Sequence, residues 1–155
     1  IHLFDVDLAN GISTRESATR AHGKNVVVAK TEFCAMGLSI CYDLRFPELY
    51  RALVARGARL VFVPSAFTAY TGQAHWDALL RARAIENQVY VIAPDQFGKN
   101  VKSFETYGHS MVIDPWGKVV AVAPDGPGLV LAEIDLDYLA RIREELPVLS
   151  HRQLR

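Results

Sequence analysis

The chain has 155 residues, about the length of one domain, and half of them are hydrophobic, so it can build a sizeable core. Its 17 basic residues balance its 17 acidic ones, which argues against nucleic acid as a partner. No apolar run approaches the roughly 20 residues of a membrane helix. Two cysteines close together in sequence make no disulfide framework, so a reducing, cytoplasmic setting is expected.

The first two thirds of the chain alternate strand-like and helix-like patterns. Pro47 suits the first position of a helix, where its missing N–H costs no hydrogen bond, and Gly57 is placed to end that helix. The polar stretch at residues 12–24 is predicted as a loop, and so is the stretch at 65–72 that follows Pro64. Strands are predicted at residues 1–8, 25–30, 36–40, 59–63 and 89–93, and helices at 47–56 and 74–88. This order favours parallel α/β units.

The last third of the chain has a different pattern. Residues 95–106 are polar and predicted as a loop, and two short apolar runs at 109–113 and 118–122 flank a turn sequence, which indicates a hairpin. A further strand is predicted at 129–134, and Asp135 can cap a helix that runs to about Leu146. The chain as a whole, residues 1–155, is therefore predicted to be a single α/β domain with an antiparallel end.

Cys41 is the residue around which these elements are arranged. It ends a buried strand and lies on a turn that leads into a helix, and open α/β sheets place their chemistry at that end of their strands. Backbone N–H groups at such a turn can lower the pKa of a thiol and hold an oxyanion. The alternative is an inert, buried thiol, which is the usual state of free cysteine. Cys34 has no turn or charge cluster after it and is predicted to belong to the core.

The residues around Cys41 resemble a known motif. Residues 41–48, Cys-Tyr-Asp-Leu-Arg-Phe-Pro-Glu, are similar to the nucleophile motif of the nitrilase superfamily, the carbon–nitrogen hydrolases. Other segments resemble the same family in the same order, and the tail segments point to its Nit branch. These segments are residues 1–5, 64–68, 71–76, 80–88, 107–117, 126–129, 146–148 and 151–152. The resemblance covers nearly the whole chain and implies a four-layer αββα sandwich, in which two sheets face each other with helices outside.

The resemblance also implies a catalytic site. The family uses a Glu base, a Lys that stabilises developing charge, a Cys nucleophile and a second Glu. Cys41 matches the nucleophile, the backbone N–H of Tyr42 matches an oxyanion donor, and Glu16 occupies the place of the second Glu, although by itself it would be assigned to a solvated loop. The family's Lys directly precedes a segment like residues 1–5, and its base Glu lies further upstream. We therefore expect this chain to be the C-terminal portion of a longer protein and to be inactive alone.

Several further residues have two open interpretations. Phe67, Thr68 and Thr71 either line the substrate pocket or pack in the core. The segment at 80–88 carries charged and amide side chains at helical spacings, expected to form a polar network that orders the floor of the site or a subunit contact. The members of this network are Arg83, Glu86 and Asn87.

The leading functional prediction is a thiol-dependent hydrolase of non-peptide carbon–nitrogen bonds. The resemblance implies a small-molecule amide as substrate, such as a small ω-amide or a deaminated-glutathione-like molecule, and a homo-oligomer. The histidines are scattered and no Gly-rich phosphate loop occurs, so neither a metal nor a cofactor is predicted. One alternative is a Cys–His hydrolase with His75 or His109 as base. The other is a non-catalytic fragment that serves as an interaction module.

Overall fold

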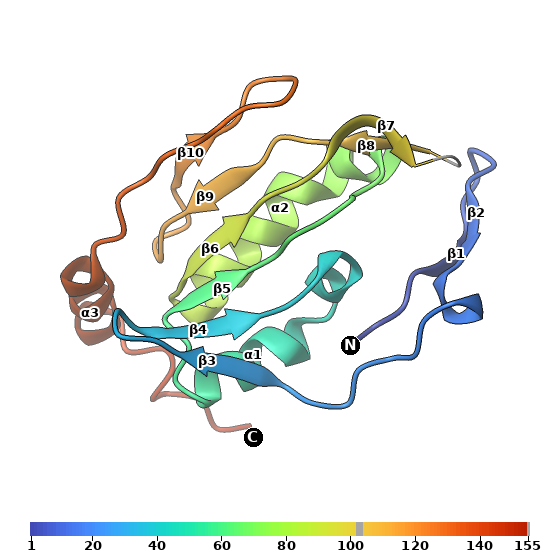
Figure 1. Ribbon diagram of the computed structural model, residues 1–155. Helices are drawn as coiled ribbons and strands as arrows, with labels where there is room; N and C mark the ends of the chain where they lie inside the picture. The colour runs from blue at the N-terminus through green and yellow to red at the C-terminus, as the bar shows by residue number, and fades with distance from the viewer. Residues whose placement is uncertain (102–103, 155) are drawn as a thin grey trace.

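The computed structural model describes residues 1–101 and 104–154, and its main feature is a six-stranded sheet in the order β10-β9-β6-β5-β4-β3 (Figure 1). β4, β5 and β6 run parallel, whereas β3, β9 and β10 pair antiparallel with their neighbours. The strands are β3 (Val27–Lys30), β4 (Ala35–Leu38), β5 (Leu60–Phe62), β6 (Tyr90–Ala93), β9 (Met111–Ile113) and β10 (Val119–Val122). The predicted α/β class with an antiparallel end is confirmed.

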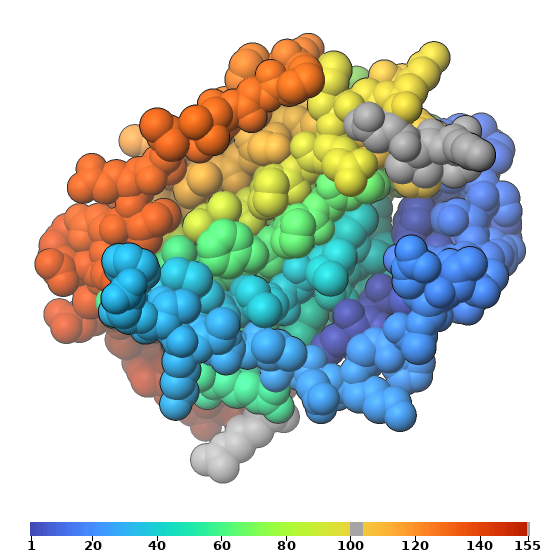
Figure 2. Space-filling model, in the orientation of Figure 1, coloured from blue at the N-terminus to red at the C-terminus, as the bar shows by residue number. Residues whose placement is uncertain are grey.

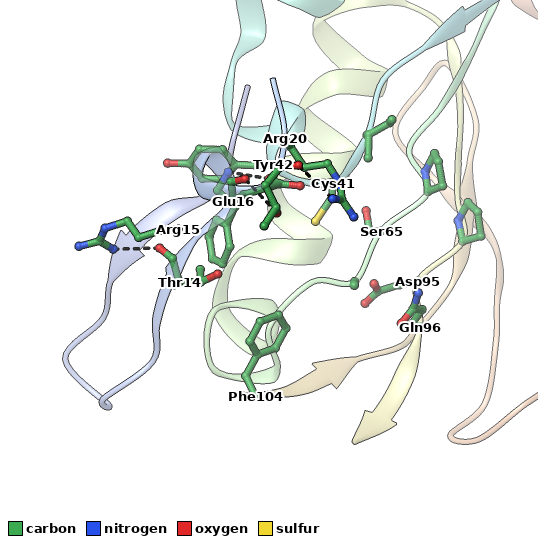
Figure 3. A pocket seen from close by; sticks show the side chains of 16 residues that line it. Thr14, Arg15, Glu16, Arg20, Cys41, Tyr42, Ser65, Asp95, Gln96 and Phe104 are labelled. Carbon is green, nitrogen blue, oxygen red and sulfur yellow. Dashed lines mark hydrogen bonds between the residues drawn. The ribbon is translucent and has the colours of Figure 1, made fainter. Parts of the chain in front are cut away.

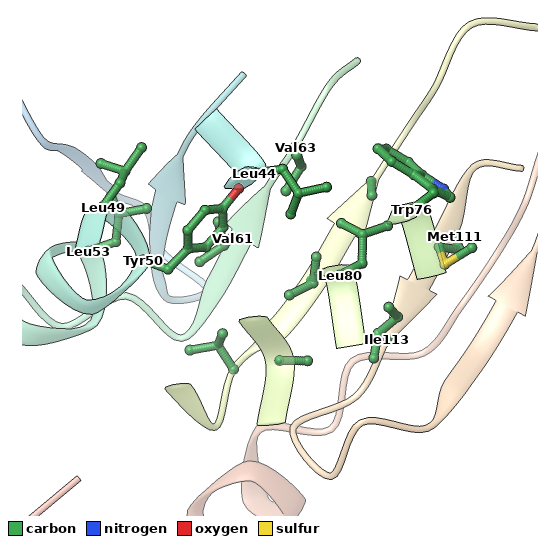
Figure 4. Close-up of a cluster of buried hydrophobic side chains, with 14 of the residues drawn as sticks. Leu44, Leu49, Tyr50, Leu53, Val61, Val63, Trp76, Leu80, Met111 and Ile113 are labelled. Carbon is green, nitrogen blue, oxygen red and sulfur yellow. The ribbon is translucent and has the colours of Figure 1, made fainter. Parts of the chain in front are cut away.

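Two helices, α1 (Pro47–Ala55) and α2 (Ala69–Asn87), cover one face of this sheet. Pro47 does occupy the first position of α1, and Gly57, with φ of +94°, follows its end. The main core forms between these helices and the sheet, around Tyr50, Trp76 and Leu80, none of which is exposed (Figure 4). A third helix, α3 (Leu136–Glu145), is capped by Asp135 as predicted, since its carboxylate accepts a hydrogen bond from the Tyr138 N–H at 2.8 Å.

The other face of the sheet carries a continuous row of apolar side chains. Gly37 of β4 faces α1, because a Cβ there would lie 3.2 Å from Leu53, so Leu38 points away from the helices. Residues paired across strands share a face, and the register joins one residue of each strand in this row. We call this set the apolar row: Val27, Leu38, Phe62, Ile92, Val112 and Ala121.

This face is open in Figure 2, which views the sheet from the side opposite α1 and α2. Val27 and Leu38 are 47% and 45% exposed. Helix α3 covers only one end of the face, where Leu139 packs with Leu60 and Tyr90, and Cys34 is half-buried against that cluster. The described chain thus supplies one helix layer and one six-stranded sheet of the four layers that the resemblance implies.

Four predictions of local structure were wrong. The predicted loop at 12–24 contains β2 (Ser13–Arg15), which pairs with β1 (Asp5–Asp7), and a 3₁₀ helix at Glu16–Ala18. The loop predicted at 95–106 instead contains a hairpin, β7 (Phe97–Val101) and β8 (Phe104–Tyr107), and residues 102–103 lie outside the described part. Both hairpins are short, and pairing between the strands rather than hydrophobic alternation defines them.

The other two errors concern residues 65–72 and 129–134. Helix α2 begins at Ala69, five residues earlier than predicted, because the Thr68 hydroxyl accepts a hydrogen bond from the Thr71 N–H and caps the helix. Residues 129–134 are apolar but form no strand: Leu129 and Leu131 are 83% and 82% exposed, on a segment that runs past the sheet to α3. Their apolar pattern alone therefore gave a wrong strand prediction.

Candidate active site

Cys41 lies at the carboxyl end of β4, as predicted, in a cleft of about 730 Å³. The cleft is bordered by the segments that follow β4, β5 and β6 and by the segment around Glu16 (Figure 3). Cys41 opens a 3₁₀ helix at Cys41–Arg45, which we call the Cys41 turn. Its N–H donates to the Pro64 carbonyl at 3.0 Å, and its φ of +44° places it in the left-handed region. The sharp turn after β4 is thus hydrogen-bonded to the segment that follows β5.

The charge environment of the Cys41 thiol differs from the expectation. Burial raises the pKa of Cys41 above its ordinary value, and the Asp95 and Glu16 carboxylates raise it further. Hydrogen bonds from the Ala66 backbone and the Ser65 hydroxyl lower this pKa but do not offset the burial. The prediction that backbone N–H groups at the turn give Cys41 a lowered pKa is therefore wrong, because desolvation and two carboxylates outweigh the donors.

Asp43 fixes the Cys41 turn to the N-terminal segment of the chain. Its side chain is 2% exposed, and its oxygens accept hydrogen bonds from the backbone N–H groups of Ile40 and His2, both at 2.9 Å. The His2 ring also contacts the carboxylate at 2.8 Å and stacks on Phe46. Burial would raise the pKa of Asp43, but these hydrogen bonds outweigh it and hold the pKa below its usual value. The sequence showed an aspartate two residues after the thiol, but neither its burial nor its contact with His2 could be read from the sequence.

Glu16 lies in the same cleft as Cys41, although 25 residues separate them in sequence. Its Oε2 atom accepts a hydrogen bond from the Phe4 N–H at 2.8 Å, which positions the carboxylate at the base of the β1–β2 hairpin. Figure 3 shows Glu16 on one side of Cys41, with Ser65 and Asp95 on the other. Tyr42 follows Cys41 in the turn, also borders the cleft, and packs its ring edge-on against Phe4. The structure thus brings together the three residues that the sequence indicated.

Phe67, Thr68 and Thr71 border a small recess beside Cys41 rather than the main cleft. All three are buried, and the two threonine hydroxyls bond to each other at 2.7 Å. The guanidinium of Arg45 lies 5.0 Å from the centre of the Phe67 ring. These residues therefore form a packed wall next to the thiol.

Asp95 is a cleft residue that the sequence analysis missed. Its two carboxylate oxygens accept hydrogen bonds from the N–H groups of Phe67, at 2.8 Å, and Gly108, at 3.0 Å. Burial raises the pKa of Asp95 to about 6, and the hydrogen bonds only partly oppose this rise. The signal was a polar residue two positions after a predicted strand, close to the position that identified Cys41.

The two histidines of the alternative mechanism do not border the cleft that contains Cys41. The exposed His75 ring accepts a hydrogen bond from Arg45 at 3.2 Å, and His109 contacts the Tyr107 carbonyl at 2.9 Å and Asp125 at 3.6 Å. Within residues 1–101 and 104–154 no three His, Cys, Asp or Glu side chains lie close enough to hold a metal. No helix in that part is long and apolar enough to span a membrane.

Comparison with known proteins identifies the family. The family model described as carbon–nitrogen hydrolase matches residues 1–144. The chain is 53% identical to a deaminated glutathione amidase of Synechocystis over 154 residues, which are 98% of this chain and 57% of that protein. A deaminated glutathione amidase of Dictyostelium discoideum is 50% identical over 156 residues, covering 99% of this chain and 54% of that protein. The chain thus spans little more than half the length of these relatives.

Solved structures agree with the sequence comparison. The C. elegans NitFhit protein superposes with a TM-score of 0.91 at 49% identity, covering 99% of this chain and 37% of that chain. Saccharomyces cerevisiae Nit3, a member of branch 10 of the nitrilase superfamily, gives a TM-score of 0.84 at 39% identity, covering 90% of this chain and 51% of that one. The fold, the order of the motifs and these matches together show that the chain belongs to the carbon–nitrogen hydrolase family of the nitrilase superfamily.

Proposed function

We propose that this chain carries the nucleophile of an amidase, with Cys41 as the attacking thiol. The observation that carries the proposal is the placement of Cys41 at the strand-to-helix turn of a cleft that also contains Glu16. The sulfur attacks the amide carbonyl carbon, and the Tyr42 N–H faces the oxygen that becomes negative. The carbon–nitrogen bond then breaks, the nitrogen leaves with a proton as ammonia or an amine, and water hydrolyses the thioester to a carboxylic acid.

The proposal assigns the proton acceptor and a cation to residues outside this chain. Such a cation would oppose the raised pKa of Cys41, because a nearby positive charge favours the thiolate. Glu16 is the second carboxylate of the site, and Phe67, Thr68 and Thr71 shape the wall beside the thiol. The chain therefore functions, in this proposal, as one part of a longer protein that holds the complete site.

The substrate class follows from the relatives. Two proteins about half identical to this chain are deaminated glutathione amidases, so we assign a small amide, with deaminated glutathione as first choice. The proposal places the enzyme in the cytoplasm as a homo-oligomer. We do not adopt the Cys–His alternative, because His75 and His109 are engaged outside the cleft. The interaction-module alternative is decided by the experiment below.

The test is turnover of deaminated glutathione by the whole protein with single cysteine replacements. Cys41→Ser should abolish hydrolysis, since a hydroxyl needs a stronger base than a thiol. Cys34→Ser is the matched control and should retain activity, because Cys34 lies against the α3 cluster. Full activity of Cys41→Ser would refute the mechanism, and an inactive wild-type protein across small amides would favour the interaction module.

A further inference from the structure

A buried cation of α2 lies under the Cys41 turn. Arg83 is 5% exposed, and its Nε and Nη2 atoms both donate to the carbonyl oxygen of Leu44, at 3.1 and 2.8 Å. Its remaining arm, Nη1, donates to Glu86 Oε1 at 3.1 Å. Leu44 belongs to the Cys41 turn. One guanidinium therefore joins the C-terminal part of a 19-residue helix to the turn that presents the thiol.

The chemistry of this contact makes it a strong restraint. The last carbonyl groups of a helical turn lack partners within the helix and carry partial negative charge, so they favour a cation. Hydrogen bonds from a charged donor are stronger than neutral ones, and two donors of one planar fork fix direction as well as distance. Arg83 therefore restrains the orientation of the Leu44 peptide and, with it, the axis of the turn.

A second set of contacts extends from Arg83 to the strand that enters the turn. The Arg83 guanidinium lies 5.4 Å from the centre of the Tyr50 ring, and the Tyr50 hydroxyl bonds to Ser39 Oγ at 3.0 Å. Ser39 in turn donates to the Phe62 carbonyl at 2.8 Å. Burial raises the pKa of Tyr50, so this hydroxyl stays neutral. Residues on both sides of Cys41, Ser39 before it and Leu44 after it, are thus held by one buried network.

We propose that Arg83 is a positioning residue for catalysis: through the Leu44 carbonyl it sets the direction in which the Cys41 thiol and the Tyr42 N–H face the substrate. The inference rests on the proposed role of Cys41. A misplacement of the attacking group by about 1 Å can lower a rate on the order of a hundredfold. The expected signature of losing this restraint is a lower kcat with little change in KM.

The test uses the whole protein with Arg83→Lys and Arg83→Gln. Lysine keeps the charge but offers a single ammonium in place of the fork, and glutamine keeps a donor without charge. We expect kcat to fall on the order of tenfold for Arg83→Lys and further for Arg83→Gln, with KM within about twofold of wild type. A smaller loss of kcat in Arg83→Lys than in Arg83→Gln would show that the conservative replacement partly preserves the restraint. The rate at which iodoacetamide alkylates Cys41 should change as well, and this reports on the turn without turnover.

Arg143→Lys is the matched control. Arg143 is half-buried, whereas Arg83 is buried, and the Arg143 Nε likewise donates to a backbone carbonyl, that of Gln88 at 3.0 Å, away from the Cys41 turn. We expect this variant to lose stability but to keep kcat within about twofold. An equal loss of kcat in Arg143→Lys and Arg83→Lys would overturn the inference, because the loss would then come from general weakening of the fold.

The remaining outcomes are also decisive. A folded Arg83→Lys with wild-type kcat and wild-type alkylation of Cys41 overturns the inference, even if Cys41→Ser is inactive and the proposed function stands. If neither Arg83 variant folds, hydrogen exchange of the wild-type protein decides. The Asp43 N–H donates to the Ile40 carbonyl, and the Phe46 N–H donates to the Asp43 carbonyl. These two amides should then be as protected from exchange as those of α2. Fast exchange there would show that the turn is not restrained.

Discussion

Cys41 shares its cleft with two carboxylates, and this arrangement explains why sequence alone misjudged the acidity of its thiol. The turn could be predicted, because Cys41 and Pro47 are close in sequence and local rules apply. The raised pKa could not, because it depends first on burial of the thiol and then on Asp95 and Glu16, and only the fold brings these about. Cys41, Tyr42 and Glu16 could therefore be predicted, whereas Asp95 and the influence of these groups on one another could not.

The first prediction concerns Asp95 and pH. The folded-state pKa of this carboxyl is raised from 3.8 to about 6, so the folded protein binds its proton more tightly than the unfolded chain. Its contribution to stability is therefore fully present below about pH 4 and is lost as the pH rises through about 6. Because the group is partly exposed, we expect a loss of about 1–2 kcal/mol.

Urea denaturation of wild type and Asp95→Asn across this pH range measures the effect. Asp95→Asn should remove this part of the pH dependence, whatever its effect at a single pH, and the exposed control Asp137→Asn should keep it. Parallel curves for wild type and Asp95→Asn would mean that Asp95 titrates normally.

The second prediction concerns Glu16. Glu16→Gln keeps an oxygen that can accept the Phe4 N–H but removes the charge from the cleft. If Glu16 serves catalysis, kcat for the whole protein should fall by about tenfold or more while the melting temperature is unchanged. Glu32→Gln, at an exposed position in the turn between β3 and β4, is the control. A wild-type kcat for Glu16→Gln would exclude a catalytic role and leave Glu16 only the structural role of accepting the Phe4 N–H.

Helix α2 shows what decides an element boundary. Its central residues had the expected helical spacing, but its first turn contains Thr71 and Gly72, which favour a loop by local propensity. Two features override that preference: Thr68 caps the helix through a local contact, and Gly72 lets β8 approach closely through Tyr107. The approach of Tyr107 comes from 35 positions away and no local pattern could reveal it, whereas the capping threonine was a local signal in the sequence.

The third prediction tests that close approach. Alanine at Gly72 would favour the helix by about 1 kcal/mol. However, its Cβ would lie 2.7 Å from Tyr107 Cδ1 and closer still to Tyr107 Cβ and Cγ. Overpacking of this kind costs about 1–3 kcal/mol, so Gly72→Ala should lower the free energy of unfolding. Gly128→Ala, where a Cβ meets nothing within 4 Å, should be nearly neutral. Chemical denaturation of both variants makes the comparison, and a more stable Gly72→Ala would show that Tyr107 moves aside freely.

At the scale of the molecule, the sheet has one covered face and one largely open face. Alternation and apolar runs sufficed to predict β3, β4, β5, β6 and the β9–β10 hairpin, since these strands bury their side chains in the main core. The order of strands and the apolar row could not be read from the sequence, because register is a property of pairs. A row this apolar needs a cover in the complete molecule, and we expect the second sheet of the sandwich to supply it.

The fourth prediction is that Leu38→Lys acts in opposite directions in two forms of the protein. In residues 1–155 alone, which we expect to aggregate and to lack amidase activity, lysine in the apolar row should raise the soluble fraction. In the whole protein the same lysine would be buried without a partner and should cost several kcal/mol. Leu129→Lys, at an 83% exposed site off the row, should leave the stability of the whole protein unchanged.

Light scattering of residues 1–155 and denaturation of the whole protein measure the two effects. A Leu38→Lys whole protein as stable as wild type would show that nothing covers the row. A soluble, active preparation of residues 1–155 by itself would overturn the proposal that the site is completed from outside this chain.

The left-handed backbone conformation of Cys41 lowers the stability of the fold at the position where the proposed chemistry needs a side chain. An L side chain in this region costs about 1–2 kcal/mol, which glycine avoids at an entropic cost of about 0.5–1 kcal/mol. Cys41→Gly should therefore unfold at a higher denaturant concentration than Cys41→Ala, although neither would hydrolyse amides; equal midpoints would show that the turn relaxes. Selection for stability alone would thus remove the thiol, and only selection for hydrolysis would retain it.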